Sequence, residues 1–236
     1  LMQAGRSFTS YSTKDGLHSD LAMDICKTDT GSLVFGSYDS GLAVYNGTEF
    51  IEYAYNDKLP GSTVWVLESD EQGNLWAGTS QGLYHEKRGE TYVLTHQNGL
   101  PGIRVTALLK DGSAIWAGSE NGFAKDDKNG MVVEEQADST GFKGKCIRSL
   151  EKLNGDLWIG AEGSVYKYSK EQFTEIEIDS TGEKPVYCIK QDSYNKLWVG
   201  TSNGLYNLDP ENNRLSRVEF NSGFASRNIN FLTNLA

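Results

Sequence analysis

The chain is poor in the residues that mark several large classes of protein. Three of its 236 residues are cysteines and four are prolines. Cys26, Cys146 and Cys188 form no CxxC or Cys/His cluster, so neither a disulfide framework nor a zinc site is indicated, and we expect small buried side chains. No apolar run reaches the roughly 18 residues that a membrane-spanning helix needs. We therefore expect the chain to meet a membrane only through regions outside this segment.

Positive charge is scarce as well. The chain has 22 lysines and arginines against 32 aspartates and glutamates, which gives a formal net charge of -10. A surface of this sign repels phosphate backbones, so we expect no nucleic acid partner.

Motifs for catalysis and for cofactors are missing. His18, His85 and His96 belong to different parts of the chain, and no Ser-His-Asp or HExxH pattern exists. The Asp70–Asn74 turn lacks the alternating oxygen ligands and the distal glutamate of a calcium loop. We expect no catalytic residue, no metal site and no cofactor in this segment.

Glycine is abundant, with 26 residues, and one glycine-containing phrase occurs five times. Its copies read GSLVFGSYDSGLAVY, GNLWAGTSQGLYHE, SAIWAGSENGFAKD, GDLWIGAEGSVYKY and NKLWVGTSNGLYNL. The shared glycine is Gly36, Gly78, Gly118, Gly160 or Gly200, at steps of 42, 40, 42 and 40 residues. Two residues earlier stands Val34, Trp76, Trp116, Trp158 or Trp198. A period of about 41 residues built from strands and turns predicts the four-stranded blades of a β-propeller.

The second copy shows how four strands fit into one repeat. Four strands are expected: residues 64–67, residues 75–79, a third strand that begins at residue 83, and residues 92–94. Gly73, and Asn195 at the same place in the fifth copy, suit a turn with positive φ. The predicted fold is therefore an all-β propeller with repeat cores near residues 33–45, 74–85, 114–124, 156–166 and 196–206.

The aligned tryptophans and glycines have an expected structural role. A tryptophan in the second strand can fill the wedge between neighbouring blades, and the glycine two residues on allows a neighbouring strand to approach closely. Trp65 lies outside this column, in an inner strand, where it either packs in the core or faces the central channel.

The ends of the chain predict an incomplete ring. We expect an outer strand at Arg6 to Tyr11, the outer strand of the fifth copy at Arg217 to Phe220, and a sixth inner strand at Asn228 to Leu232. Five complete repeats and a partial sixth leave sheet surface exposed. We therefore expect residues 1–236 to be one propeller segment of a longer polypeptide; the alternative is that a second chain completes the surface.

The repeat resembles the two-component regulator propeller repeat. The resemblance is carried by Gly99-Leu100-Pro101, by Asp70 to Tyr84 and by Lys196 to Tyr206, and it extends over all five copies. It implies a seven-bladed propeller in the periplasmic sensor region of a hybrid histidine kinase, an inner-membrane protein whose kinase lies elsewhere in the chain. It also implies recognition of a glycan-derived oligosaccharide without catalysis.

Some positions depart from the family pattern. The first copy has Val34 and Phe35 where the others have tryptophan and a small residue, and the fourth lacks a threonine before Gly163-Ser164. The family has no invariant catalytic set, so no functional residue can be transferred from it.

The candidate ligand-binding residues come instead from the loops expected at one mouth of the channel. These loops enter the inner strands or join the second and third strands, and they differ between copies while the core is constant. They supply His18, Asp20, Tyr38, Asp39, Arg104, Glu120, Asn121, Lys145, Arg148 and Arg227. This mixture suits a polar or anionic sugar, with arginine or lysine paired to carboxylate or sulfate.

Three functions follow as hypotheses. The first is an extracytoplasmic sensor propeller that binds an oligosaccharide or another small molecule without turnover. The second is a propeller enzyme similar to streptogramin lyases, with His18 as its base. The third is a structural blade array that forms a homodimer and binds no small molecule.

Overall fold

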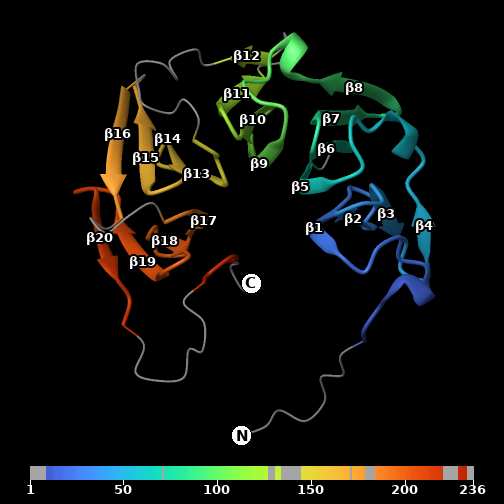
Figure 1. Ribbon diagram of the computed structural model, residues 1–236, viewed down its shortest axis with the longest axis horizontal. Helices are drawn as coiled ribbons and strands as arrows, with labels where there is room; N and C mark the ends of the chain where they lie inside the picture. The colour runs from blue at the N-terminus through green and yellow to red at the C-terminus, as the bar shows by residue number, and fades with distance from the viewer. Residues whose placement is uncertain are drawn as a thin grey trace, which may run out of the picture. The chain divides into compact units, whose positions relative to one another are not determined.

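The computed structural model describes residues 9–70, 72–126, 145–170, 172–178, 184–219 and 228–232, and the backbone of 131–133. Regular structure in these residues consists of β-strands and three short 3-10 helices, η1 (Thr13–Asp15), η2 (Asn56–Lys58) and η3 (His96–Asn98). The strands form five separate four-stranded antiparallel sheets, as the repeat predicts, and we call these sheets blades 1 to 5 (Figure 1).

Two compact units divide these blades. The N-terminal unit comprises Leu1–Ser80 and Tyr84–Val93. Blade 1 has the strands β1 (Ala22–Lys27), β2 (Leu33–Ser37), β3 (Leu42–Tyr45) and β4 (Phe50–Glu52). Blade 2 has the strands β5 (Val64–Ser69), β6 (Asn74–Thr79), β7 (Gly82–Lys87) and β8 (Glu90–Leu94).

The C-terminal unit comprises Gln81–Leu83 and Leu94–Ala236 and contains three blades. Blade 3 has β9 (Val105–Asp111), β10 (Ala114–Ser119), β11 (Gly122–Asp126) and β12 (Met131–Val133). Blade 4 has β13 (Ser149–Leu153), β14 (Asp156–Gly160), β15 (Ser164–Ser169) and β16 (Gln172–Glu177). Blade 5 has β17 (Val186–Gln191), β18 (Leu197–Thr201), β19 (Gly204–Asp209) and β20 (Arg214–Arg217).

The turn between the first two strands of a blade forms as its residues predict. Gly73 has a φ of 79° and Asn195 a φ of 60°, so both adopt the left-handed conformation expected of them. In blade 5 the Asp192 carboxylate accepts the backbone N–H groups of Tyr194 and Lys196 at 2.8 and 3.0 Å. The same carboxylate accepts the indole N–H of Trp198 at 2.8 Å, so it joins the turn to the second strand.

The repeated glycine is required because the next blade packs directly against it. A Cβ built on Gly160 would lie 2.7 Å from Cγ1 of Val186, the first residue of β17. A Cβ on Gly118 would lie 2.6 Å from Cγ2 of Ile147. The Val186 N–H donates to the carbonyl of Ala161 at 3.0 Å, which fixes this contact. We call the β-branched residue that covers each glycine the anchor residue of the following blade.

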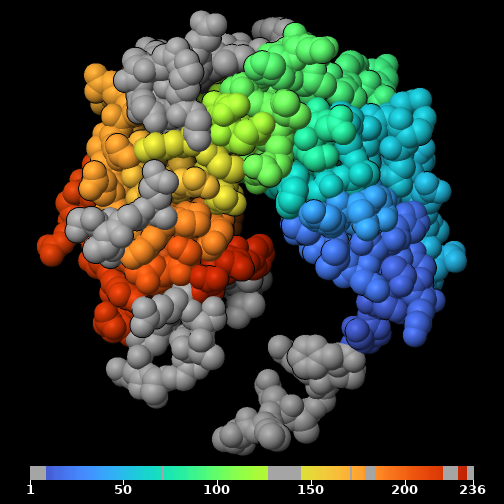
Figure 2. Space-filling model, in the orientation of Figure 1, coloured from blue at the N-terminus to red at the C-terminus, as the bar shows by residue number. Residues whose placement is uncertain are grey.

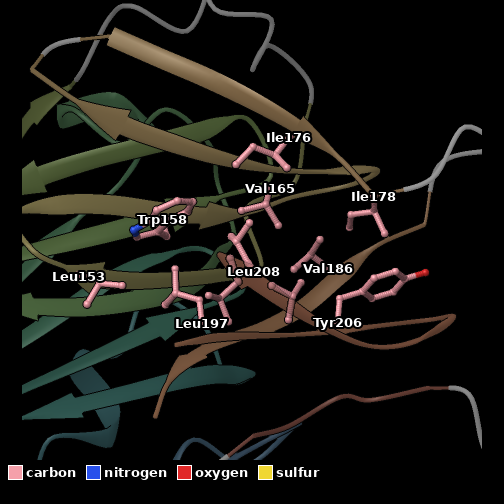
Figure 3. Close-up of a cluster of buried hydrophobic side chains, with 11 residues drawn as sticks. Leu153, Trp158, Val165, Ile176, Ile178, Val186, Leu197, Tyr206 and Leu208 are labelled. Carbon is pink, nitrogen blue, oxygen red and sulfur yellow. The ribbon is translucent and has the colours of Figure 1, made fainter. Parts of the chain in front are cut away.

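Hydrophobic clusters fill the space between consecutive blades of a unit. In the C-terminal unit, β13 lies next to both β9 and β17, and the space-filling view shows blades 3, 4 and 5 in contact (Figure 2). One cluster joins Trp158, Val165 and Ile176 of blade 4 to Val186 and Leu197 of blade 5 (Figure 3). Trp158 is fully buried there, as the wedge role predicts.

Three strand predictions at the chain ends were wrong. Residues 9–11 of the predicted strand Arg6 to Tyr11 are not in a strand, and the other residues of that range lie outside the described part of the chain. The outer strand of blade 5 was predicted at Arg217 to Phe220, but β20 covers Arg214–Arg217, residues 218–219 are not in a strand, and Phe220 lies outside the described part of the chain. The strand begins earlier because Asn213, with a φ of 56°, ends the preceding turn.

The segment 228–232 forms no strand, but Ile229 takes the expected place of an anchor residue. Its N–H donates to the Thr201 carbonyl at 2.9 Å. Its Cγ2 would lie 2.8 Å from a Cβ on Gly200. The chain therefore reaches the position of a sixth inner strand without forming the ladder.

Candidate functional site

The first strand of several blades contains a β-bulge at its beginning, directly after the anchor residue. The register shifts between Val64 and Val66 in β5, and between Val186 and Cys188 in β17. The extra residues are Trp65 and Tyr187. Bulges re-aim side chains and are common next to binding sites, so we examined what these two residues contact.

In the N-terminal unit, Trp65 contacts an exposed tyrosine. Its ring centroid lies 5.9 Å from that of Tyr38, at an interplanar angle of 87°, which is an edge-to-face arrangement. Tyr38 comes from the loop between β2 and β3 and is 48% exposed, whereas Trp65 is half-buried. We call these two residues the aromatic pair; the half-buried ring of Trp65 packs against the ring of Tyr38 and leaves much of the Tyr38 ring open to solvent.

In the C-terminal unit, Tyr187 belongs to a charged cluster. Nη2 of Arg148 donates to Oε1 of Glu162 at 3.1 Å, and the guanidinium carbon lies 5.8 Å from the Tyr187 ring centroid. The side chains of Arg148 and Glu162 are 36% and 39% exposed. We call these three residues the Arg148 cluster. The aromatic ring orients the guanidinium, and the ion pair presents a donor and an acceptor side by side.

The loop that carries Glu162 differs from its counterparts because it lacks a hydroxyl group. In blades 1, 3 and 5 the hydroxyls of Ser37, Ser119 and Thr201 donate to a carbonyl at the start of the third strand, at 2.9 to 3.0 Å. Blade 4 has Ala161 at this position. The loop binds to blade 5 through the Gly163 N–H and the Lys184 carbonyl at 3.1 Å, as blade 1 binds to blade 2 through the Gly41 N–H and the Ser62 carbonyl at 2.9 Å, and in addition through a β-bridge between Glu162 and Pro185. The β-bridge places Glu162 next to the start of β17, and its carboxylate pairs with Arg148.

Lys145 lies in a second polar network, beside blade 4. Its ammonium contacts the Tyr166 hydroxyl and lies 3.3 Å from Oε1 of Glu175. The same carboxylate oxygen accepts hydrogen bonds from Ser164 Oγ at 2.7 Å and from Tyr166 Oη at 2.6 Å. The hydrogen bonds from Ser164 and Tyr166, followed by the Lys145 charge, lower the pKa of Glu175 below its ordinary value.

A lowered folded-state pKa means that ionised Glu175 stabilises the fold. This contribution is present above the ordinary glutamate pKa of 4.5 and is lost as the pH falls through the lower folded-state value. We expect Glu175→Gln to reduce the free energy of unfolding at pH 7 by less than about 1 kcal/mol, since the side chain is 45% exposed. Urea denaturation at pH 7 and at pH 3 should show the difference from the unsubstituted chain shrinking at the lower pH; an equal difference at both would contradict this assignment.

The other predicted site residues have mainly structural contacts. Glu120 accepts the backbone N–H groups of Ile103 and Arg104, each at 2.8 Å. Asp20 accepts the Thr13 N–H at 2.7 Å and so holds η1. Asp39 also makes a local contact, since its carboxylate accepts a hydrogen bond from the Ser40 hydroxyl at 3.0 Å.

Three predicted residues remain. Asn121 donates its backbone N–H to the Ser119 hydroxyl at 3.2 Å. His18 is half-buried, and Arg227 lies outside the described residues. Among the predicted residues, the structure thus brings Tyr38 and Arg148 into clusters with side chains from the next blade.

No repeat motif singles out Tyr187, and the sequence alone leaves the role of Trp65 open. A usable signal was present, because both residues follow an anchor residue directly. The same position in the repeat holds Met23, Trp65, Thr106, Arg148 and Tyr187. Aligning this column, whose members differ while the anchor residues are alike, would have identified it.

Within the described residues, no group of three or more histidine, cysteine, aspartate or glutamate side chains is placed to hold a metal ion. The same part of the chain contains no helix with the length and apolarity to cross a bilayer. The aromatic pair and the Arg148 cluster are the two candidate sites.

The chain is similar in structure to several larger proteins. It matches the extracellular domain of BT4673 from B. thetaiotaomicron, assigned to a one-component or a hybrid two-component system, with 19% identity and a TM-score of 0.58 over 91% of this chain and 35% of that one. PorZ, a surface component of the type-IX secretion system of Porphyromonas gingivalis, matches with 17% identity and a TM-score of 0.69 over 91% of this chain and 36% of that one. The chain spans about a third of the length of these two structures.

Virginiamycin B lyase from Staphylococcus aureus matches with 15% identity and a TM-score of 0.66 over 86% of this chain and 71% of that one. No curated protein sequence matches the chain. Similarity at these identities establishes the fold, and with the five four-stranded sheets it makes this chain an all-β protein of the propeller type.

The repeats themselves can be identified more closely. The family model of the two component regulator propeller matches residues 58–81 and 180–203. Each match covers the first two strands of a blade, β5 and β6 in blade 2, and β17 and β18 in blade 5. The chain therefore carries two component regulator propeller repeats.

Proposed function

We propose that this chain is the ligand-binding part of an extracytoplasmic sensor of a bacterial two-component signalling protein, and that it recognises a glycan-derived oligosaccharide without catalysis. The observation that carries the proposal is the aromatic pair. An exposed tyrosine ring packed against a half-buried tryptophan offers the apolar face of a sugar a flat surface that is already ordered. The repeat family and the extracellular signalling domains of similar fold support the assignment to a periplasmic sensor.

The proposed mechanism is binding without turnover. Ligand contacts would favour one of two arrangements of the sensor and its neighbouring regions, and the change would be passed on to a kinase elsewhere in the protein. Such coupling requires that the ligand bind the two arrangements with different affinity.

A thermal-shift screen of the intact sensor against a panel of oligosaccharides tests the proposal. A ligand at 100 times its Kd adds about 2.7 kcal/mol of stability, which raises the Tm measurably. We expect one class of glycan to raise the Tm and to remain intact on prolonged incubation. Degradation of the glycan that is abolished by His18→Ala would favour a lyase, and no shift across the panel would favour a structural array.

The aromatic pair gives a residue-specific prediction. We expect Tyr38→Ala to weaken binding of the glycan identified in the screen by about tenfold, because a stacking tyrosine contributes on the order of 1 kcal/mol or more. Calorimetric titration measures the effect, and the Tm without ligand should change little because Tyr38 is largely exposed. Tyr194→Ala is the matched control, since Tyr194 is 82% exposed in the turn between β17 and β18. Equal affinity in both variants would remove the aromatic pair from the site.

A further inference from the structure

The Arg148 cluster indicates which chemical class of sugar the proposed sensor binds. The inference below rests on the proposed function. Arg148 and Glu162 are linked by a single nitrogen–oxygen contact of 3.1 Å, and each side chain remains more than a third exposed. The guanidinium has further N–H donors, and the carboxylate has further lone pairs. The pair thus offers hydrogen-bond donors and acceptors next to one another on the protein surface.

The charges of the cluster cancel. The neighbouring cations are also engaged: Lys145 pairs with Glu175, and Lys190 pairs with Glu151 at 3.0 Å. Lys184, which precedes β17, has an interaction of its own. The whole chain carries a formal charge of -10, so its long-range field adds repulsion of anions.

An acidic sugar fits this arrangement poorly. A carboxylate or sulfate placed on Arg148 would lie close to the Glu162 carboxylate, and like charges at such a separation repel by an amount that shifts affinity by at least tenfold. Two adjacent hydroxyls of a neutral sugar fit well, because one can accept from the guanidinium while the other donates to the carboxylate. Tyr187 acts as a positioning residue, since its ring lies beneath the guanidinium.

We propose that the Arg148 cluster binds a neutral sugar residue through two adjacent hydroxyl groups and selects against uronic acids and sulfated sugars. Of the polar and anionic sugars that the loop residues suggest, the structure favours the neutral class.

Matched ligands test this selectivity on the intact protein. Calorimetric titration would compare tetramers of galacturonate, glucuronate and mannuronate with their carboxyl-reduced neutral counterparts. We expect a neutral member to bind at least about tenfold more tightly than its acidic counterpart. Tighter binding of the acidic member would overturn this inference and leave the proposed function standing, whereas absence of binding by either set would contradict both.

Three variants assign the selectivity to the cluster. Arg148→Ala should weaken binding of the neutral tetramer about tenfold, because the donor is lost. Glu162→Gln should raise the affinity for the acidic tetramer relative to the neutral one by about tenfold, because the repelling charge is removed. Lys152→Ala is the control: it removes a cation of β13, the strand that Arg148 directly precedes, whose partner is Asp111, and it should change neither affinity.

If Glu162 had only a structural role, Glu162→Gln would not change the ratio of the affinities for the acidic and the neutral tetramer. If Glu162→Gln left the ratio of the two affinities unchanged while its Tm matched that of the unsubstituted protein, the cluster would not determine selectivity. The same conclusion would follow if Lys152→Ala and Arg148→Ala affected binding equally.

Discussion

Replacing Trp158 with alanine should lower the free energy of unfolding by about 3–5 kcal/mol, the range typical of a buried tryptophan. Trp158 is fully buried and packs with residues of both blades 4 and 5, so its removal opens a cavity at the contact between them. Urea denaturation followed by far-UV circular dichroism would measure the loss.

Two variants make this test specific. Trp158→Phe should cost much less than the alanine substitution, because the indole N–H of Trp158 has no hydrogen-bond partner in the described part of the chain and a phenyl ring keeps an aromatic face beneath Lys167, whose Nζ lies 5.1 Å from the ring centroid. Tyr194→Ala, at an exposed turn, should change stability by less than about 0.5 kcal/mol. A small effect of Trp158→Ala, comparable to that of Tyr194→Ala, would mean that the cluster between these blades contributes little.

Gly160→Ala should destabilise the protein by about 1–3 kcal/mol, the usual cost of overpacking a tight site. The added methyl group would lie 2.7 Å from Val186 Cγ1, which is backed by the buried cluster and cannot move aside. The measurement is again the urea midpoint and slope. Gly112→Ala separates sterics from backbone strain: Gly112 has a φ of 62° and nothing within 4 Å of its ideal Cβ, so the cost there comes from the left-handed conformation alone.

A double-mutant cycle tests the anchor contact directly. If the clash with Val186 causes the loss, Gly160→Ala combined with Val186→Ala should be at least about 1 kcal/mol more stable than the sum of the single effects predicts. Strict additivity would show that Gly160 is required for another reason.

The repeat made the blades predictable from sequence, because it repeats both turn chemistry and packing. Gly73 and Asn195 marked tight turns, and the glycine column marked a close approach. The chain ends were predicted less well. Strand β20 ends at Arg217, where the outer strand was predicted to begin, since the sequence pattern gave no weight to Asn213 as a left-handed turn residue.

The candidate site was harder to predict, because its geometry depends on contacts between blades. The loop residues Tyr38 and Arg148 were found from their position alone. Their partners Trp65 and Tyr187 follow anchor residues in the next blade, and a β-bulge rather than strict strand alternation sets their direction. The sequence also did not indicate that the Glu120 carboxylate accepts the backbone N–H groups of Ile103 and Arg104 in its own blade.

The anchor contact also bears on how the chain folds as it is synthesised. Every described strand pairs with its neighbour in sequence, and Gly36, Gly118, Gly160 and Gly200 are each covered by an anchor residue fewer than about 30 positions later. Folding of each blade therefore requires only short loops to close. Contacts that are local in sequence favour rapid folding, even in an all-β chain. A blade can complete its buried face as soon as the first strand of the following blade has emerged from the ribosome, so folding can proceed from the N-terminus one blade at a time.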